Sequence, residues 1–334
     1  MTETRHAQIG DLPLRLGGTL RNAQLAYATW GTLAPDGRNA ILCTHGFTSS
    51  HLFVADRGWS ALVGPGKPID TDRFFVVSSN MLGSSYGSTA PASLDLDTGR
   101  PYGPDFPRIT LPDIVAAQKR MLDGLGVKHL AAVIGNSYGG FQAFTWGVEF
   151  PDFMRGLVPV ETAPKMRAPF DEAGLVAKFS ADPNWNGGHY YATGGIAETM
   201  TTLRIATLKQ YGAEEGLRAK GLDGPAIEAE ITRQARAWAA EFDAHSMLAL
   251  GRAINTYDVT DRLDRIKAKL LYVISRTDVL FPPTLRDWVM PMLAQAGVDA
   301  AYHEIDTEHG HMGSGADPDK WAPVLAAFLG ALPG

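Results

Sequence analysis

Residues 135–139, Gly-Asn-Ser-Tyr-Gly, constrain the fold more than any other stretch of this chain. They follow the apolar run 130–134 and precede a helix-like run that begins at Phe141. A strand, a Gly-x-Ser-x-Gly turn and a helix make a sharp elbow that lifts the serine hydroxyl clear of a sheet. The sequence therefore predicts that Ser137 is a nucleophile that forms a covalent acyl intermediate. The alternative is a glycine-rich turn whose serine only caps a helix.

The composition argues against several classes of protein. Of the 334 residues, 45% are apolar and 20% charged, as in an ordinary globular enzyme. The net charge of −6 and the lack of a basic tract argue against nucleic acid or an anionic membrane as partner. No apolar run approaches the length of a membrane span and the N-terminus is polar, so we expect a cytoplasmic protein. The single cysteine, Cys43, lies in an apolar run and is predicted to be a small core residue.

Short apolar runs alternate with helical patterns along much of the chain. The runs 40–44, 74–78, 156–160 and 270–274 are typical of strands that are covered on both faces. Residues 111–125 show helical spacing, with Thr110 or Asp113 as the N-terminal cap. Residues 24–30 read as a strand of an antiparallel lead-in. This alternation predicts an α/β fold with a mostly parallel central sheet flanked by helices.

Residues 168–264 differ from the rest, because helical segments such as 226–239 separate two core strands there. An insertion at this place is typical of a lid over the site of an α/β-hydrolase. We therefore expect an α/β-hydrolase fold whose core comprises residues 1–167 and 265–334, with residues 168–264 as an inserted helical lid.

An activated serine needs a histidine to accept its proton and a carboxylate to fix the tautomer of that imidazole. In α/β-hydrolases the chain order is serine, then aspartate or glutamate, then histidine. Asp278 follows the run 270–274 and fits the carboxylate, although a cap or turn aspartate is the alternative. His311 lies on a glycine-rich loop after a strand-like run and fits the base, with His309 as the fallback.

Two backbone N–H groups must stabilise the negative charge that develops during acyl transfer. Tyr138 follows the serine and supplies one; Phe47, in the loop after residues 40–44, supplies the other. His45 and His51 lie in the same loop, and we expect them to maintain its shape.

The pattern His-Gly-His at residues 309–311, preceded by Glu308, could also ligate zinc. The chain has no further histidine or cysteine cluster with ligand spacing, so we expect neither a metal nor a bound cofactor.

Several segments beyond the serine turn resemble the homoserine O-acetyltransferase family of α/β-hydrolase-fold enzymes. They are His-Gly-Phe-Thr at 45–48, Asp-Arg-Phe-Phe-Val-Val at 72–77, Asn-Met-Leu-Gly at 80–83 with Gly-Ser-Thr at 87–89, Thr-Gly-Arg-Pro-Tyr-Gly-Pro-Asp-Phe-Pro at 98–107, and Asp-Pro-Asn-Trp at 182–185. The resemblance runs from about residue 25 to the C-terminus.

The resemblance implies a triad of Ser137, Asp278 and His311 that takes an acyl group from a donor such as acetyl-CoA and passes it to an alcohol. In the family a lid arginine holds the carboxylate of homoserine, and Arg204 matches it; Tyr211 lies in the matching aromatic position. A surface-helix arginine is the alternative for Arg204. Family members are commonly dimers that pair through their lids, so the resemblance also implies a homodimer.

Two positions depart from the family pattern. Gly-Asn-Ser-Tyr-Gly-Gly replaces Gly-Gly-Ser-Met-Gly-Gly around the serine, and Met312 stands where the family has an aspartate that binds the ammonium group of the acceptor. A thioether cannot offset a buried ammonium charge, which disfavours homoserine unless a carboxylate such as Asp317 swings in.

We therefore expect an enzyme that hydrolyses a small ester through an acyl-enzyme. The alternative is an O-acyltransferase that moves an acetyl or succinyl group from acyl-CoA to an alcohol other than homoserine. A binding protein on the same scaffold is a third hypothesis, and the intact set of serine, aspartate and histidine argues against it.

Overall fold

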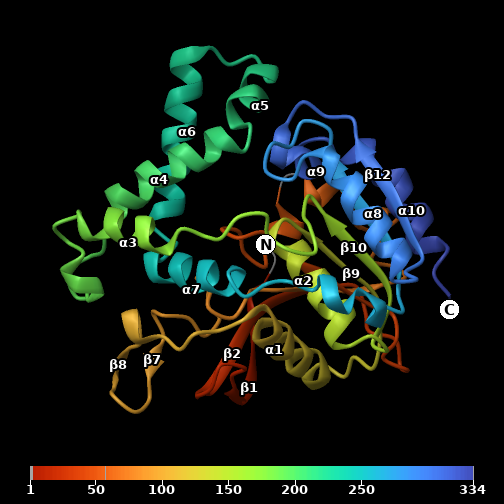
Figure 1. Ribbon diagram of the computed structural model, residues 1–334, viewed down its shortest axis with the longest axis horizontal. Coiled ribbons are helices and arrows are strands. Elements are labelled where there is room, and N and C mark those ends of the chain that lie inside the picture. Colours follow the sequence, from red (N-terminus) through yellow and green to blue (C-terminus); the bar gives the residue numbers. More distant parts are fainter. Residues whose placement is uncertain (1–2, 57, 334) are drawn as a thin grey trace.

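The computed structural model describes residues 3–56 and 58–333 and is built on one eight-stranded sheet (Figure 1). In spatial order its strands are β1 (Arg5–Pro13), β2 (Thr19–Trp30), β6 (Phe75–Ser79), β3 (Ala40–Thr44), β9 (Leu130–Asn136), β10 (Met154–Val160), β11 (Lys269–Ser275) and β12 (Ala300–Ile305). The pairs β1–β2 and β2–β6 are antiparallel and the remaining pairs are parallel. The predicted mostly parallel sheet with an antiparallel lead-in is confirmed.

Apolar side chains cover both faces of the sheet. Along β3, Ala40 and Leu42 face one hydrophobic cluster while Ile41 and Cys43 face another, as the two-residue period of a strand requires. Helices α1 (Leu111–Gly124) and α2 (Tyr138–Glu149) contribute to the first cluster, and α10 (Ala322–Gly330) contributes to the second. Strand β3 is therefore apolar on both faces of the sheet, as expected of a parallel strand covered by helices on each side.

Helix α1 begins where the sequence indicated. The Thr110 hydroxyl accepts a hydrogen bond from the Asp113 amide, and the Asp113 carboxylate accepts one from the Thr110 amide, so both predicted candidates take part in one capping box. The other helices are α3 (Glu172–Ser180), α4 (Ala197–Gln210), α5 (Ala213–Ala219), α6 (Gly224–Ala239), α7 (Ala244–Ile254), α8 (Arg286–Gln295) and α9 (Gly313–Ala316). Two small sheets pair β4 (Val63–Gly64) with β5 (Ile69–Asp70) and β7 (Leu94–Asp95) with β8 (Arg100–Pro101).

Helices α3 to α7 all lie between β10 and β11 in the chain, and α4 to α6 extend away from the sheet (Figure 1). Leu208, Ala213, Ile227 and Ile231 form part of a separate hydrophobic cluster between α4, α5 and α6. Helix α7, by contrast, packs into the main cluster. The helical insertion is thus observed, while its role as a lid and its limits at 168 and 264 stay predictions.

Among the described residues, no helix is both long enough and apolar enough to cross a membrane.

Candidate active site

The serine turn is a strained elbow between β9 and α2. Ser137 has φ 56° and ψ −118°, a conformation that side chains rarely adopt. Glycine at position 139 permits it, because a Cβ atom there would lie 2.0 Å from the carbonyl oxygen of Thr44. Strand β3 therefore approaches the elbow too closely for any larger residue at position 139.

Three residues from the carboxyl ends of separate strands meet at this hydroxyl. Ser137 follows β9, Asp278 follows β11 and His311 follows β12. The His311 Nε2 atom lies 2.8 Å from the Ser137 Oγ, and its Nδ1 atom lies 2.7 Å from the Asp278 Oδ2. The carboxyl ends of parallel strands share one edge of a sheet, so residues 174 positions apart in sequence are brought into contact.

The surroundings of His311 favour a strong base. Burial alone would lower the pKa of His311, but the hydrogen bond and charge of Asp278, together with the charge of Glu161, raise it above the ordinary value of 6.5. Asp278 is itself buried, and its Oδ1 atom accepts hydrogen bonds from the amides of Leu280 and Phe281 at 2.8 and 3.0 Å. The carboxylate is therefore fixed on both oxygens, and it orients the imidazole.

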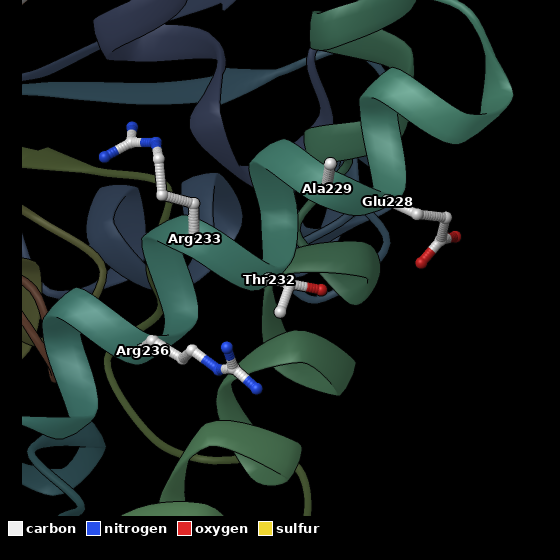
Figure 2. A pocket seen from close by; sticks show the side chains of 5 residues that line it. All are labelled: Glu228, Ala229, Thr232, Arg233 and Arg236. Atoms are coloured by element: carbon white, nitrogen blue, oxygen red, sulfur yellow. The ribbon is translucent and has the colours of Figure 1, made fainter.

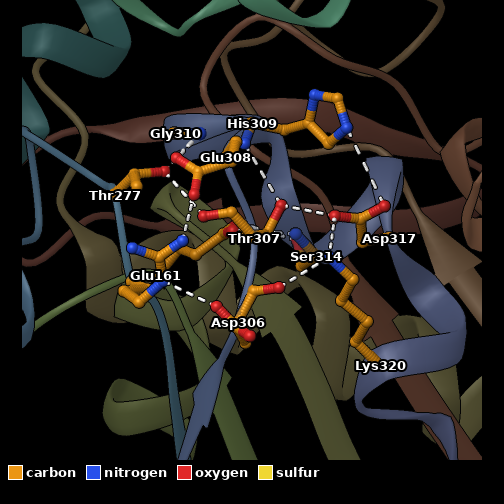
Figure 3. A network of polar contacts seen from close by, with 11 residues as sticks. Glu161, Thr277, Asp306, Thr307, Glu308, His309, Gly310, Ser314, Asp317 and Lys320 are labelled. Carbon is orange, nitrogen blue, oxygen red and sulfur yellow. Dashed lines mark hydrogen bonds and ion pairs between the residues drawn. The ribbon is translucent and has the colours of Figure 1, made fainter. Parts of the chain in front are cut away.

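The loop that carries His311 is tied to the loop that carries Asp278 (Figure 3). The Thr277 hydroxyl donates to the carbonyl of Thr307 at 2.9 Å and accepts from the amide of Gly310 at 3.1 Å. His309, the fallback base, turns toward Asp317, with its Nε2 atom 3.8 Å from the carboxylate. It is His311 that the structure places against Ser137.

The residues of the possible zinc motif, Glu308, His309 and His311, have different partners in the structure. Glu308 pairs with Arg276, and His311 is held by Asp278. Within residues 3–56 and 58–333, no group of three or more histidine, cysteine, aspartate or glutamate side chains is arranged to hold a metal.

Phe47 and Tyr138, whose amides are predicted to stabilise negative charge, lie in contact with each other next to the serine turn. Tyr138 is the first residue of α2, where an amide has no partner within the helix. Phe47 lies in the turn after β3, and its ring stacks on that of Tyr138 at 5.7 Å between centroids. Helix α2 thus points its N-terminus, the positive end of its dipole, at the serine.

His45 shapes this turn. Its Nδ1 atom lies 2.9 Å from the carbonyl of Gly46, and its Nε2 atom accepts a hydrogen bond from the amide of Met81. Burial lowers the pKa of His45 to about 4, so the ring is neutral at pH 7. It holds the loop that carries Phe47 and has no contact with the serine among the described hydrogen bonds.

The bulk of Tyr138 is directed away from the serine. Its ring is 1% exposed, and its hydroxyl donates to the carbonyl of Leu250 in α7 at 3.1 Å. The departure from the family pattern at this position therefore joins the elbow to the inserted helices.

Arg204 reaches the same turn from α4. One guanidinium nitrogen donates to the Thr48 hydroxyl at 2.8 Å, and the group lies 5.1 Å above the ring of Trp238. Burial lowers the pKa of this guanidinium, yet arginine stays charged at pH 7. Among the described residues no carboxylate pairs with Arg204, and its buried Nε atom has no hydrogen-bond partner. The site thus holds an uncompensated positive charge one residue from Phe47.

Tyr211, just after α4, is the second residue of the insertion at the site. Its ring lies 5.1 Å from that of His311, between centroids. The insertion therefore contacts the loop after β3, through Arg204 at Thr48, and the catalytic loop after β12, through Tyr211 at His311.

Sequence reasoning missed Glu161, which is fully buried behind His311. The signal was present, because Glu161 directly follows the apolar run 156–160 just as Ser137 and Asp278 follow theirs. A charged residue at the carboxyl end of a buried parallel strand is a candidate for the site.

Comparison with known proteins defines first the class of fold. The profile of the family described as "alpha/beta hydrolase fold" matches residues 39–287. In solved structures the chain resembles esterase E22, with a TM-score of 0.88 and 27% identity over 98% of this chain and 100% of that one. The α/β-hydrolase fold predicted from the sequence is confirmed.

Curated relatives narrow the class. The homoserine O-acetyltransferase of Haemophilus influenzae is 36% identical over 93% of both chains. The homoserine O-succinyltransferase of Methylibium petroleiphilum is 36% identical over 96% of this chain and 92% of that protein. The chain belongs to the homoserine O-acetyltransferase family of α/β-hydrolase-fold enzymes. The resemblance and the prediction of an enzyme are thereby confirmed, and the relatives favour transfer over hydrolysis.

Proposed function

We propose that this enzyme is an O-acyltransferase that moves a small acyl group from acyl-CoA to the hydroxyl of an anionic acceptor. Ser137 is the nucleophile, His311 the general base and acid, and Asp278 the residue that orients the imidazole. The hydrogen-bonded order Ser137–His311–Asp278, at 2.8 and 2.7 Å, supports the acyl-transfer chemistry.

The reaction proceeds in two exchanges. The Ser137 oxygen attacks the thioester carbonyl carbon and gives its proton to His311, while the amides of Phe47 and Tyr138 stabilise the oxyanion. The carbon–sulfur bond breaks, and the CoA thiolate takes the proton from His311. An acceptor hydroxyl then gives its proton to His311, its oxygen attacks the acyl-enzyme, and Ser137 leaves with that proton. No bound cofactor is required, because acyl-CoA enters as a co-substrate.

Arg204 is the observation that favours transfer to an anionic alcohol. A guanidinium withdrawn from water without a carboxylate is costly, and an acceptor carboxylate would compensate it. Hydrolysis by water would leave Arg204 without a function. A guanidinium and a carboxylate can form two parallel hydrogen bonds, which would hold the acceptor hydroxyl at a fixed distance from the acyl-enzyme.

The direct test incubates enzyme, acetyl-CoA or succinyl-CoA and a set of hydroxy acids, and follows release of free CoA. CoA release that requires both an added hydroxy acid and Ser137 supports transfer. Equal release without any acceptor rejects it in favour of hydrolysis.

A small-ester hydrolase is the second candidate, and Met312 is the observation that favours it. Its side chain is 41% exposed and supplies no charge for an ammonium group. Serine-dependent turnover of short aryl esters, unaffected by hydroxy acids, would support this candidate.

We also propose that the enzyme acts in the cytoplasm as a homodimer paired through the insertion. The exposed face of α6, lined by Glu228, Ala229, Thr232, Arg233 and Arg236, is one surface available to a partner (Figure 2). Light scattering on purified protein measures the mass, and an Arg236→Glu variant tests whether this face contributes. A monomer at micromolar concentration would reject the dimer.

A further inference from the structure

Glu161 is a buried carboxylate that the steps above do not use. It follows β10, between the strands that precede Ser137 and Asp278 in the sheet, and is 0% exposed. Its φ of 50° is unusual for a residue with a side chain. A strained, charged and buried residue at the functional edge of a sheet calls for a specific role.

Three hydrogen bonds hold the Glu161 carboxylate. Its Oε1 atom accepts from the Ser275 hydroxyl at 2.5 Å and from the Ser314 amide at 2.9 Å. Its Oε2 atom accepts from the Ser314 hydroxyl at 2.7 Å. No lysine or arginine pairs with Glu161 among the described residues. The carboxylate is thus stabilised by neutral donors, and its negative charge is free to act on its surroundings.

The partners of Glu161 belong to the segments that carry the other two members of the triad. Ser275 ends β11, three residues before Asp278, and Ser314 lies in α9, three residues after His311. These segments touch at this point, since a Cβ atom at Gly313 would lie 2.3 Å from the Ser275 hydroxyl. Glu161 therefore connects the segment that carries Asp278 to the segment that carries His311 through its hydrogen bonds to Ser275 and Ser314.

Charge connects Glu161 to the same residues. Burial raises the pKa of Glu161 to about 7, while the charge of His311 lowers it and that of Asp278 raises it. Reciprocally, the charge of Glu161 acts with Asp278 to raise the pKa of His311. Protonation of His311 and ionisation of Glu161 thus favour each other.

We propose that Glu161 is a positioning residue for His311. It fixes the Asp278 and His311 segments relative to each other, and its negative charge stabilises the imidazolium that forms when Ser137 attacks. This inference rests on the proposed function of Ser137 and His311.

The test uses a fluorophosphonate, which reacts with an activated serine and needs no knowledge of the substrate. The second-order rate of labelling at Ser137, located by mass spectrometry, is measured from pH 5 to 9 for the wild type and three variants. Glu161→Gln removes the charge and keeps the shape. Glu308→Gln is the matched control, because it removes a carboxylate from an exposed position near the same loop. Ser314→Ala removes one hydrogen bond to Glu161 and keeps the charge.

For Glu161→Gln we expect the rate on the plateau to fall roughly 10- to 100-fold, because small displacements of catalytic groups cost this much. The midpoint of the acid limb should also move to lower pH, which a purely structural role would not produce. Ser314→Ala should shift the midpoint in the same direction by less, and Glu308→Gln should leave it in place.

An unchanged midpoint in a folded Glu161→Gln variant overturns the inference. Should that variant fail to fold, as judged by thermal melting, an unchanged midpoint in Ser314→Ala overturns it instead. Failure of the wild type to label at Ser137 would reject the proposed function itself, so the two failures are distinguishable.

Discussion

The carboxyl edge of the sheet and the inserted helices hold their buried charges differently. At the sheet edge, the carboxylates of Asp278 and Glu161 each accept three hydrogen bonds from protein groups, so both oxygens of each carboxylate have partners within the protein. In the insertion, Arg204 contacts a hydroxyl and an aromatic face, and no carboxylate among residues 3–56 and 58–333 pairs with it. On the function proposed above, an acceptor carboxylate would supply the partner that Arg204 lacks. The sheet edge would then carry the reaction chemistry, and the insertion would carry the choice of substrate.

The largest effect should come from the sheet edge. Replacing Ser137 by alanine should lower kcat by about 10⁴-fold or more, since the members of a triad act as one unit. Steady-state kinetics with any accepted substrate measures this loss, and Asp278→Asn should cost somewhat less. A thermal melting curve matching that of the wild type controls for folding. Activity within tenfold of the wild type would mean that the elbow is not the reaction centre.

The insertion should affect binding more than chemistry. Arg204→Ala should raise KM for an anionic acceptor roughly 10- to 100-fold, because a charged hydrogen bond contributes about 1.5–3 kcal/mol. The value of kcat should change little.

Arg286→Ala is the matched control, because it removes an exposed arginine at the start of α8, outside the insertion and outside the face of α6 proposed to pair in the dimer. A neutral acceptor should show no difference between the two variants. If Arg204→Ala lowered kcat and left KM unchanged, the separation between the two regions would not hold.

The dependence of activity on pH tests the sheet edge alone. His311 acts as a base only when neutral, and Asp278 and Glu161 raise its pKa above 6.5. The value of kcat/KM should therefore fall about tenfold per pH unit below a midpoint that lies above 6.5. The Arg204→Ala variant should show the same midpoint. A midpoint below 6.5 would contradict the environment described for His311.

The smallest effect is expected at Met312, an exposed residue that directly follows His311 in the chain. Met312→Asp should increase turnover of an acceptor that carries an ammonium group by several-fold, and homoserine is the acceptor to try. Stability should change by no more than about 0.5 kcal/mol, because the side chain is 41% exposed. Met312→Asn is the uncharged control. An equal gain in both variants would assign the effect to polarity instead of charge.

The sequence alone predicted much of the sheet edge and less of the insertion. Ser137, Asp278 and His311 each follow a strand-like run in the sequence, which placed them at strand ends. In a parallel sheet the carboxyl ends of the strands share one edge, so these residues come together whatever the details of side-chain packing. The sequence favoured His311 and left His309 as the fallback, because both lie on the same loop; the structure places His311 against Ser137 and His309 near Asp317.

The contacts of the insertion were harder to predict, because they do not follow from the regular spacing of apolar residues in a helix or strand. The contact of Arg204 with Thr48 depends on the orientation of α4 relative to the loop after β3. The hydrogen bond from Tyr138 to Leu250 depends on the position of α7. Glu161 was missed for a related reason, because its partners Ser275 and Ser314 are adjacent only after three strands have been aligned.

The burial of Cys43 makes the protein suitable for labelling the inserted helices at one chosen position. The chain has no other cysteine, and this one lies at 0% exposure within β3, where burial raises the pKa of its thiol to about 12. It stays protonated and out of reach of alkylating dyes. A cysteine introduced at Ala229 on the exposed side of α6 would then be the sole reactive thiol, so a single fluorophore could report the position of the insertion without any background mutation.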